Sequence, residues 1–190
     1  STEDAQIARP GKASSLDLPF LRPAALAGDQ ASAQSVALHA LDWLQDTRAI
    51  VPDYVMWLQP TSPFRPPHVI LRAYELIGAG VADAVIGVKT LHRSPDTLFH
   101  MDSGGMLAAL GDSTAAATRR QDVKTLYTPN GAMYVVRSHV LREQNTFFPP
   151  RTLGLPMNPI ESHDIDDATD WAIAQALVQA QLVWPVSAAD

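Results

Sequence analysis

Cysteine is absent from the 190 residues of the chain. Its absence excludes disulfides, thiolate metal ligands and a cysteine nucleophile, and it fits a reducing cytoplasm. Basic residues are also few, because 14 Lys and Arg stand against 20 Asp and Glu, for a formal net charge of -6. A broad nucleic-acid or membrane-surface footprint needs clustered Lys and Arg, so we expect neither partner. A few well-placed cations would have to bind any anionic ligand.

Long apolar runs and the common nucleotide motifs are missing as well. No run of about 18 apolar residues occurs, and the N-terminal stretch STEDAQIARPGK is polar, so we expect neither a membrane span nor a signal peptide. Neither GxGxxG nor GxxxxGK[ST] is present, which disfavours a dinucleotide dehydrogenase and a P-loop enzyme. The six histidines form no HExxH pattern, which disfavours a zinc site.

The composition that remains is typical of one globular domain over residues 1–190. Hydrophobic residues make up 46% of the chain and charged residues 18%. Asp29 or Ser32 is available as the N-cap of a first long helix, and Gly78 and Gly80 stand where a second helix must end. Apolar periodicity predicts helices at 32–45, 66–80 and about 167–181, and strands at 54–58, 83–88, 131–136 and 182–186.

The order of these elements predicts an α/β fold. A strand, a helix and a strand follow one another between residues 54 and 88, as in a βαβ unit with parallel strands. The uninterrupted apolar run YVMWL (54–58) favours a strand buried on both faces of that sheet. We therefore expect a mostly parallel sheet with helices on both faces. Residues 90–126 are loop-like, and we expect an excursion from the sheet there.

Two polar segments are candidates for ligand binding. LQPTSPFR (58–65) follows a buried strand, where ligands bind in open parallel sheets, and the amide of Gln59 could bind a polyol. The alternative is a rigid turn in which a hydroxyl of the segment bonds its own backbone. RRQD (119–122) carries two guanidinium groups that could grip a carboxylate or a phosphate. Solvated surface ion pairs are the alternative for these arginines.

Two further segments each allow two interpretations. PNGAMY (129–134) predicts a turn that leads into a strand, because Asn-Gly tolerates positive φ. TFFPP (146–150) carries paired phenylalanines, which are either core residues or the wall of an apolar pocket.

The acidic stretch ESHDIDDATDW (161–171) divides into two pairs by spacing. Asp164 and Asp166 would point to the same side of an extended segment and could converge on one cation. Two carboxylates with open positions suit Mg²⁺, which keeps waters and takes its other ligands from substrate phosphates. Asp167 and Asp170 stand where the N-cap and the first-turn acid of the last helix belong.

Taken in order, six segments resemble the acylneuraminate cytidylyltransferases, or CMP-sialic acid synthetases, a branch of the nucleotide-sugar-transferase α/β fold. The segments are PFLRPAALAGDQAS, LQPTSPFR, RRQD, YTPNGAMY, FF and SHDIDDATDW. The resemblance implies transfer of a cytidylyl group from CTP to a nonulosonic (sialic-type) acid, with release of pyrophosphate. It also implies a homodimer formed through a small dimerisation insertion, for which residues 90–126 are the candidate.

The resemblance further implies roles for individual residues. Asp164 and Asp166 would hold Mg²⁺ against the phosphates, and Arg120, with Arg119, would grip the sugar carboxylate or orient the reacting hydroxyl. The other implied contacts are the sugar with Gln59 and Tyr134, with Asn130 shaping the pocket, its acyl group with Phe147 and Phe148, and the nucleotide with Arg22 and Ser32.

The chain departs from the family at its start. Family members open with a strand and a loop resembling ARxxSKGxxxKN that cradles the CTP phosphates, and this sequence has no such loop. We therefore expect a member that is truncated at its N-terminus. Two alternatives remain at this point, namely a catalytically inactive sugar-binding remnant and a nucleotidyltransferase for another sugar acid.

Overall fold

The computed structural model describes residues 1–14, 16–28, 30–92, 98–110 and 125–183. These residues fold into two compact units: one comprises 1–57, 71–85 and 133–153, and the other 58–70, 86–132 and the chain from 154 onward. The elements are α1 (Ala5–Ala13), a 3-10 turn (Ala24–Leu26), α2 (Ala33–Arg48), β1 (Tyr54–Trp57), α3 (Pro67–Gly78), β2 (Ala84–Leu91), β3 (Phe99–Met101), β4 (Leu107–Ala109), β5 (Leu126–Arg137), α4 (Ser138–Gln144), β6 (Thr152–Pro156) and α5 (Ala168–Gln179). Among the described residues, no helix is long and apolar enough to cross a membrane.

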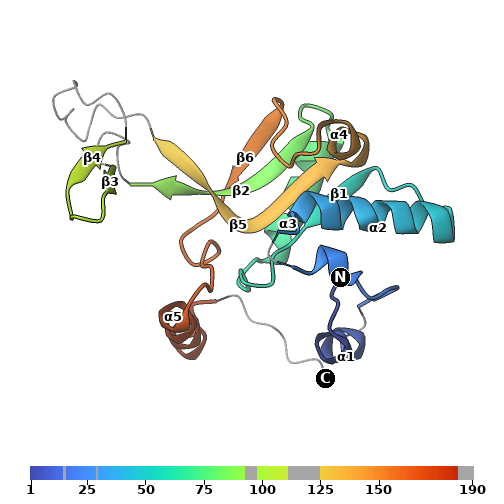
Figure 1. Cartoon of the computed structure of the whole chain (residues 1–190), viewed down its shortest axis with the longest axis horizontal. Helices are drawn as coiled ribbons and strands as arrows, with labels where there is room; N and C mark the ends of the chain where they lie inside the picture. The colour runs from blue at the N-terminus through green and yellow to red at the C-terminus, as the bar shows by residue number, and fades with distance from the viewer. Residues whose placement is uncertain (15, 29, 93–97, 111–124, 184–190) are drawn as a thin grey trace. The chain divides into compact units, whose positions relative to one another are not determined.

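Four strands form a sheet in the order β1-β5-β2-β6 (Figure 1). β1 pairs antiparallel with β5, with Trp57 opposite Tyr134. β2 and β6 run parallel, because the N–H of Asp83 donates to the carbonyl of Arg151 and, further along both strands, the N–H of Met157 donates to that of Val88. The α/β class is confirmed, and the sheet is mixed.

The sequence interpretation of β1 was wrong in one respect. We expected a strand buried on both faces of a parallel sheet, whereas all four residues of β1 are half-buried and its partner β5 is antiparallel. The reason is that β5 lies between β1 and β2, so the two strands of the predicted βαβ unit are not neighbours. An apolar run of four residues cannot reveal which later strand will pair with it.

The core of the first unit lies between α2, α4 and the sheet. Its buried residues are Ala37, Leu41, Ala84, Val136, Val140, Leu141 and Phe147. The hydroxyl of Ser32 caps α2 by accepting the N–H of Ser35 at 3.1 Å, which confirms one of the two predicted caps. α3 ends as predicted, with Gly80 at a φ of +76°. The sequence did not predict the short elements α1, the 3-10 turn, β3, β4, α4 and β6.

The Asn-Gly pair at 130–131 is not a turn. Both residues lie inside β5, where Asn130 is 3% exposed and Gly131 has a φ of +77°. The positive φ that the dipeptide tolerates is therefore used within a strand, and the prediction of a turn before residue 131 was wrong.

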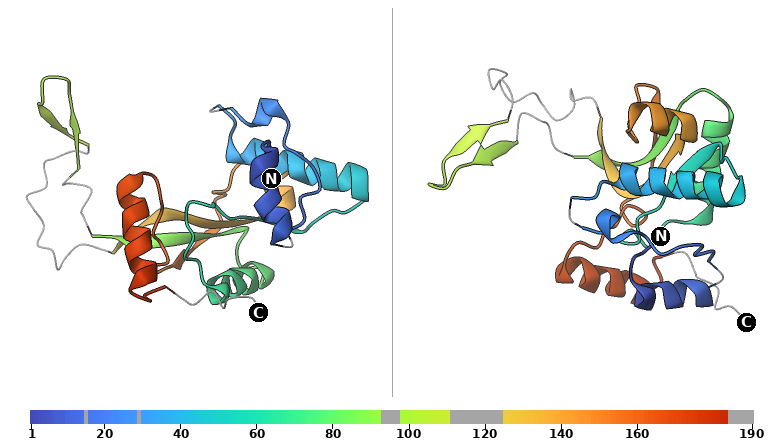
Figure 2. Two further views of the ribbon diagram at one scale, coloured as in Figure 1. Left: turned by 90° about the horizontal axis from the view of Figure 1, so that it is seen from below. Right: turned by 45° about the vertical axis from the view of Figure 1, so that its right-hand side comes forward.

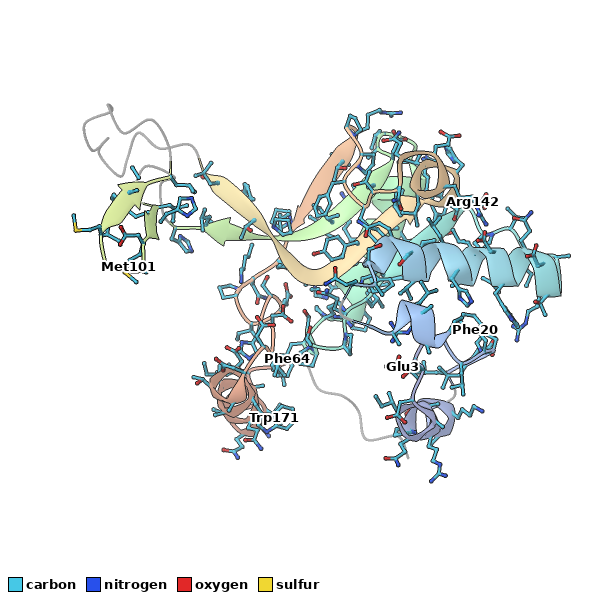
Figure 3. The ribbon with its side chains drawn as sticks, in the orientation of Figure 1. Glu3, Phe20, Phe64, Met101, Arg142 and Trp171 are labelled. Atoms are coloured by element: carbon cyan, nitrogen blue, oxygen red, sulfur yellow. The ribbon has the colours of Figure 1, made fainter. Side chains whose placement is uncertain are left out.

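Part of the segment predicted as loop-like forms a hairpin. β3 and β4 pair antiparallel in a sheet of their own (Figure 2), and Oδ1 of Asp102 accepts the N–H groups of Gly104 and Met106 in the connecting turn. The side chain of Met101 projects away from this hairpin (Figure 3). The hairpin and its flank expose Phe99, Met101, Met106, Leu107 and Leu110.

α5 begins with the predicted cap. Oδ1 of Asp167 accepts the N–H groups of Thr169 at 2.7 Å and Asp170 at 3.0 Å, and Oδ2 of Asp170 accepts the N–H of Asp167 at 3.2 Å. Of the apolar side chains of α5, Trp171 and Val178 are more than half exposed, whereas Ala174 is buried and Leu177 is half-buried. The predicted last strand at 182–186 is not seen at Leu182 and Val183, and its remainder lies outside the described residues.

The capping carboxylate makes the stability of α5 depend on pH. Hydrogen bonds from the backbone of Asp170 and Thr169 hold the pKa of Asp167 below its ordinary value. The part of the stabilisation that depends on the charge is therefore fully present above the pKa that Asp167 has in the unfolded chain, and it is lost as the pH falls through the lower folded-state pKa. Asp167→Ala should lower the thermal midpoint at neutral pH, and the difference should narrow below the folded-state pKa, where the protonated side chain is an uncharged cap. Asp167→Asn keeps an uncharged cap and should retain most of the midpoint. Equal midpoints for Asp167→Ala and the unmodified protein at pH 7 would contradict this account.

Candidate active site

The second unit contains a cavity of about 690 Å³. Asp164 and Asp166 both line it, so the structure brings the predicted metal pair to one cavity. Asp170, His163 and Lys89 also contribute to its wall. The two aspartates lie on the irregular segment that joins the turn at 159–162 to α5, where they are not committed to a helix or a strand.

The segment at 163–166 is hydrogen-bonded to the turn at 59–62 through one side chain, that of Asp164, and through the backbone of Ile165. The hydroxyl of Ser62 lies 3.1 Å from Oδ1 of Asp164, and the N–H of Ile165 donates to the carbonyl of Thr61 at 2.9 Å. Ser62 is 0% exposed. The ring of Phe64 stacks on that of His163 with centroids 6.0 Å apart, and Figure 3 labels Phe64 in this region. These contacts fix the position of the Asp164 carboxylate.

Gly131 is the point at which β5 meets this carboxylate. A Cβ at this position would lie 2.7 Å from Oε1 of Gln59 and 3.0 Å from Oδ2 of Asp164. The first distance is shorter than real Cβ atoms show and the second is tight, and Gly131 also has a φ of +77°, so this close approach favours glycine. Gln59 and Asp164, which the sequence analysis assigned to sugar and metal, are therefore neighbours.

Asn130 influences the shape of the cavity indirectly, by contacting two residues that line the cavity wall. Its Nδ2 donates to Oγ of Ser162 at 2.9 Å and lies 3.1 Å from Sδ of Met157, and both partners line the cavity. Its Oδ1 accepts the N–H of Ala132 at 3.1 Å, which satisfies the buried amide on both sides. Asn130 is thus bound to protein groups and acts on the cavity indirectly.

Arg65 belongs to the same network, and the sequence analysis assigned it no role. Its Nη1 donates to the carbonyl of Gln59 at 2.8 Å and to that of Ser62. Burial lowers the pKa of Arg65, and the charge of Asp164 acts in the opposite direction, so the guanidinium remains protonated. The signal available in the sequence was a single arginine at the end of a proline-rich turn.

The donor set of this cavity fits a magnesium ion. Across the described parts of the chain, no three His, Asp or Glu side chains cluster tightly enough to form a site made of protein ligands alone. A pair of carboxylates, one of them anchored by Ser62, suits Mg²⁺, which keeps several waters and takes its other ligands from phosphates. Asp166 is exposed, so such a ligand could reach it from solvent.

The first unit holds the predicted aromatic residues. The Tyr134 ring lies 5.9 Å from that of Phe147 and 5.7 Å from that of Phe148, and the Trp57 ring lies 6.0 Å from Phe147. The paired phenylalanines were predicted to be either core residues or the wall of an apolar pocket. Phe147 is 3% exposed and belongs to the core, whereas Phe148 is 50% exposed. Only Phe148 is available as an open pocket wall.

The two predicted nucleotide contacts have structural partners of their own. Arg22 pairs with Glu3 at 2.8 Å, and the Ser32 hydroxyl caps α2. These partners do not test a role with a nucleotide. Arg119 and Arg120, predicted to grip the sugar carboxylate, lie outside the described residues.

Comparison with known proteins gives the family. The chain is 30% identical over 186 residues to the CMP-N,N'-diacetyllegionaminic acid synthase of Legionella pneumophila, covering 94% of this chain and 76% of that protein. The chain belongs to the acylneuraminate cytidylyltransferase family. It is also 28% identical over 152 residues to the N-acylneuraminate cytidylyltransferase of Streptococcus agalactiae serotype V, of which it spans 35%. No protein-family model matches the chain.

Solved structures support the fold of this family member. CMP:2-keto-3-deoxy-manno-octonic acid synthetase, solved with CTP, superposes with a TM-score of 0.61 at 11% identity over 95% of this chain and 79% of the other. A 4-diphosphocytidyl-2C-methyl-D-erythritol synthase from Anaerococcus prevotii gives a TM-score of 0.54 at 14% identity, over 94% of this chain and 78% of the other. At these identities the likeness concerns the fold alone.

The contact at Gly131 can be tested by adding one methyl group. Gly131→Ala forces alanine into positive φ and pushes its Cβ against Gln59 and Asp164. The conformational strain alone costs about 1–2 kcal/mol, and the crowding adds to it. Chemical denaturation should therefore show a loss of at least this size.

Gly105→Ala is the matched control, because Gly105 also has positive φ but open space where its Cβ would lie. It should show the strain without the crowding. Equal losses in the two variants would contradict the close packing at Gly131.

Proposed function

We propose that the protein transfers the cytidylyl group of CTP to a nonulosonic acid of the sialic, legionaminic or pseudaminic type. The observation that carries the proposal is the cavity in which Asp164 and Asp166 lie together, with Gln59 beside Asp164 at Gly131. Relatives named as CMP-N,N'-diacetyllegionaminic acid synthase and N-acylneuraminate cytidylyltransferase support the substrate class.

The proposed reaction forms one bond and breaks another. The anomeric hydroxyl oxygen of the sugar acid bonds to the α-phosphorus of CTP, the bond to the β-phosphate oxygen breaks, and pyrophosphate leaves as the hydroxyl proton is released. A bound magnesium ion would neutralise charge on the phosphate oxygens. Asp164 and Asp166 would hold that ion, and Lys89, a cation in the wall of the same cavity, would bind phosphate oxygens directly.

We assign the remaining roles from the family resemblance. Arg120 and Arg119 would grip the sugar carboxylate. The other proposed contacts are the sugar with Gln59 and Tyr134, the acyl group with Phe148, and the nucleotide with Arg22 and Ser32. The buried Asn130 and Phe147 would shape the pocket without contacting the sugar. We place the reaction in the cytoplasm, in keeping with the absence of cysteine.

A pyrophosphate-release assay tests the proposal. The chain with CTP, Mg²⁺ and each of the three sugar acids should release pyrophosphate with at least one of them. Asp164→Asn should reduce the rate by about 100-fold or more, because it removes a group that stabilises the developing charge. Asp167→Asn is the matched control, since Asp167 caps α5, and it should keep the rate.

Turnover that survives Asp164→Asn would contradict the metal assignment. Binding of a sugar acid without any turnover would instead support an inactive sugar-binding protein.

We further propose that the protein is a homodimer and that the hairpin β3–β4 contributes to the interface. Five apolar side chains between residues 99 and 110 are each more than half exposed. A concentration of exposed apolar groups on so short a segment marks an interaction surface. Residues 90–126 lie where the family resemblance places a dimerisation insertion, and this position supports a second copy as the partner.

Charge placed on the hairpin should dissociate the dimer. Met101→Lys combined with Leu107→Lys would bury two ammonium groups without partners, which strongly opposes association. Analytical ultracentrifugation should show a shift from dimer to monomer. Val81→Lys changes an exposed apolar residue outside the hairpin and should leave the dimer intact. A monomeric unmodified protein at micromolar concentration, or an unaltered dimer in the double variant, would contradict this interface.

A further inference from the structure

We propose that Ser62 and Arg65 are positioning residues for the carboxylate of Asp164. In this view the Ser62 hydroxyl occupies Oδ1 and leaves Oδ2 to bind the divalent cation, and Arg65 holds the turn that carries Ser62. The inference rests on the proposed function, because it concerns the same metal site.

The hydrogen bond between Ser62 and Asp164 holds the carboxylate in one position, because Ser62 is itself buried and cannot move freely. Ser62 is fully buried, and Oδ1 of Asp164 lies 3.1 Å from its hydroxyl. An ionised carboxylate can only accept, so the hydroxyl donates its single proton to Oδ1. The other oxygen, Oδ2, lies on the side of Gly131 and Gln59, because a Cβ on Gly131 would be 3.0 Å from Oδ2 and 2.7 Å from Oε1 of Gln59. The two oxygens of one carboxylate therefore have different environments.

A metal ligand held in this way binds more tightly than a free one. Partners that hydrogen-bond a ligating carboxylate orient it, and their removal typically costs 10–100-fold in metal affinity. Asp166 is exposed, and the backbone N–H of Asp166 is bound to Asp170 rather than to a group of the cavity turn. Most of the preorganisation of the pair therefore comes from Asp164.

Arg65 supports the turn from its other side. Its Nη1 bridges the carbonyls of Gln59 and Ser62, and the N–H of Ser62 donates to the carbonyl of Gln59 at 3.3 Å. Holding a partly buried guanidinium against two neutral carbonyls costs desolvation, which the nearby charge of Asp164 partly offsets. Arg65 therefore positions two residues of the site. One is Gln59, the proposed sugar contact, and the other is Ser62, which holds the proposed metal ligand Asp164.

The arrangement predicts a split between two variants. Ser62→Ala removes only the hydrogen bond to Asp164, so it should weaken metal binding and leave the affinity for the sugar acid unchanged. Arg65→Lys keeps the positive charge but cannot hold the same planar geometry, so it should weaken both. A residue with a merely structural role would not separate the two affinities in this way.

The test uses Mn²⁺ as a probe for the cation, with its binding to the full chain in the presence of CTP measured by electron paramagnetic resonance. Ser62→Ala should bind Mn²⁺ about 10–100-fold more weakly. Thr61→Ala, which removes an exposed hydroxyl from the same turn, should bind it normally. Isothermal titration of the sugar acid supplies the second affinity, and thermal unfolding verifies that each variant is folded. If Ser62→Ala does not fold, Ser62→Cys replaces it, since a thiol is a similar-sized but weaker donor and should also weaken Mn²⁺ binding.

The outcomes separate this inference from the proposed function. If Asp164→Ala loses Mn²⁺ and Ser62→Ala binds it normally, the positioning role is wrong and the metal site stands. If neither substitution changes Mn²⁺ binding, the metal assignment itself fails.

Discussion

The site depends on the close approach of strand β5 at Gly131, a residue that has no Cβ atom. β5 crosses the turn at 59–62 and the segment at 163–166 so closely that a single Cβ would contact both Gln59 and Asp164. The positive φ of Gly131 allows the strand to make this approach. Three segments far apart in the sequence are thereby brought to one place, and two of them contribute the polar side chains of Gln59 and Asp164.

This arrangement requires burial of polar groups, and the chain satisfies them with one another. Ser62, Asn130 and Ser162 are all nearly inaccessible to solvent, and each has a hydrogen-bond partner. A buried network of this kind holds side chains in one orientation when it is fully paired and destabilises the fold when one member is removed. The same bonds that give the cavity its shape therefore make its residues difficult to replace.

Local sequence predicted the elements whose pattern is local. The Ser32 cap, the Gly80 stop and the Asp167 cap were visible because each uses residues within one helical turn. The Asn130–Gly131 pair was misread because a turn and a kink within a strand require the same backbone freedom, and only packing against Gln59 and Asp164 distinguishes them. Spacing also separated Asp164 from Asp167 correctly with respect to the cap. Arg65 was missed because its partners are backbone carbonyls, which leave no trace in the sequence.

We propose that one cavity of this protein holds a divalent cation between Asp164 and Asp166 and that CTP completes its coordination. The most direct measurement is anomalous diffraction from crystals grown with Mn²⁺ and CTP. The account predicts one strong anomalous peak between these two carboxylates, adjacent to the CTP phosphates. A peak elsewhere, or bound CTP with no metal at this position, would contradict it.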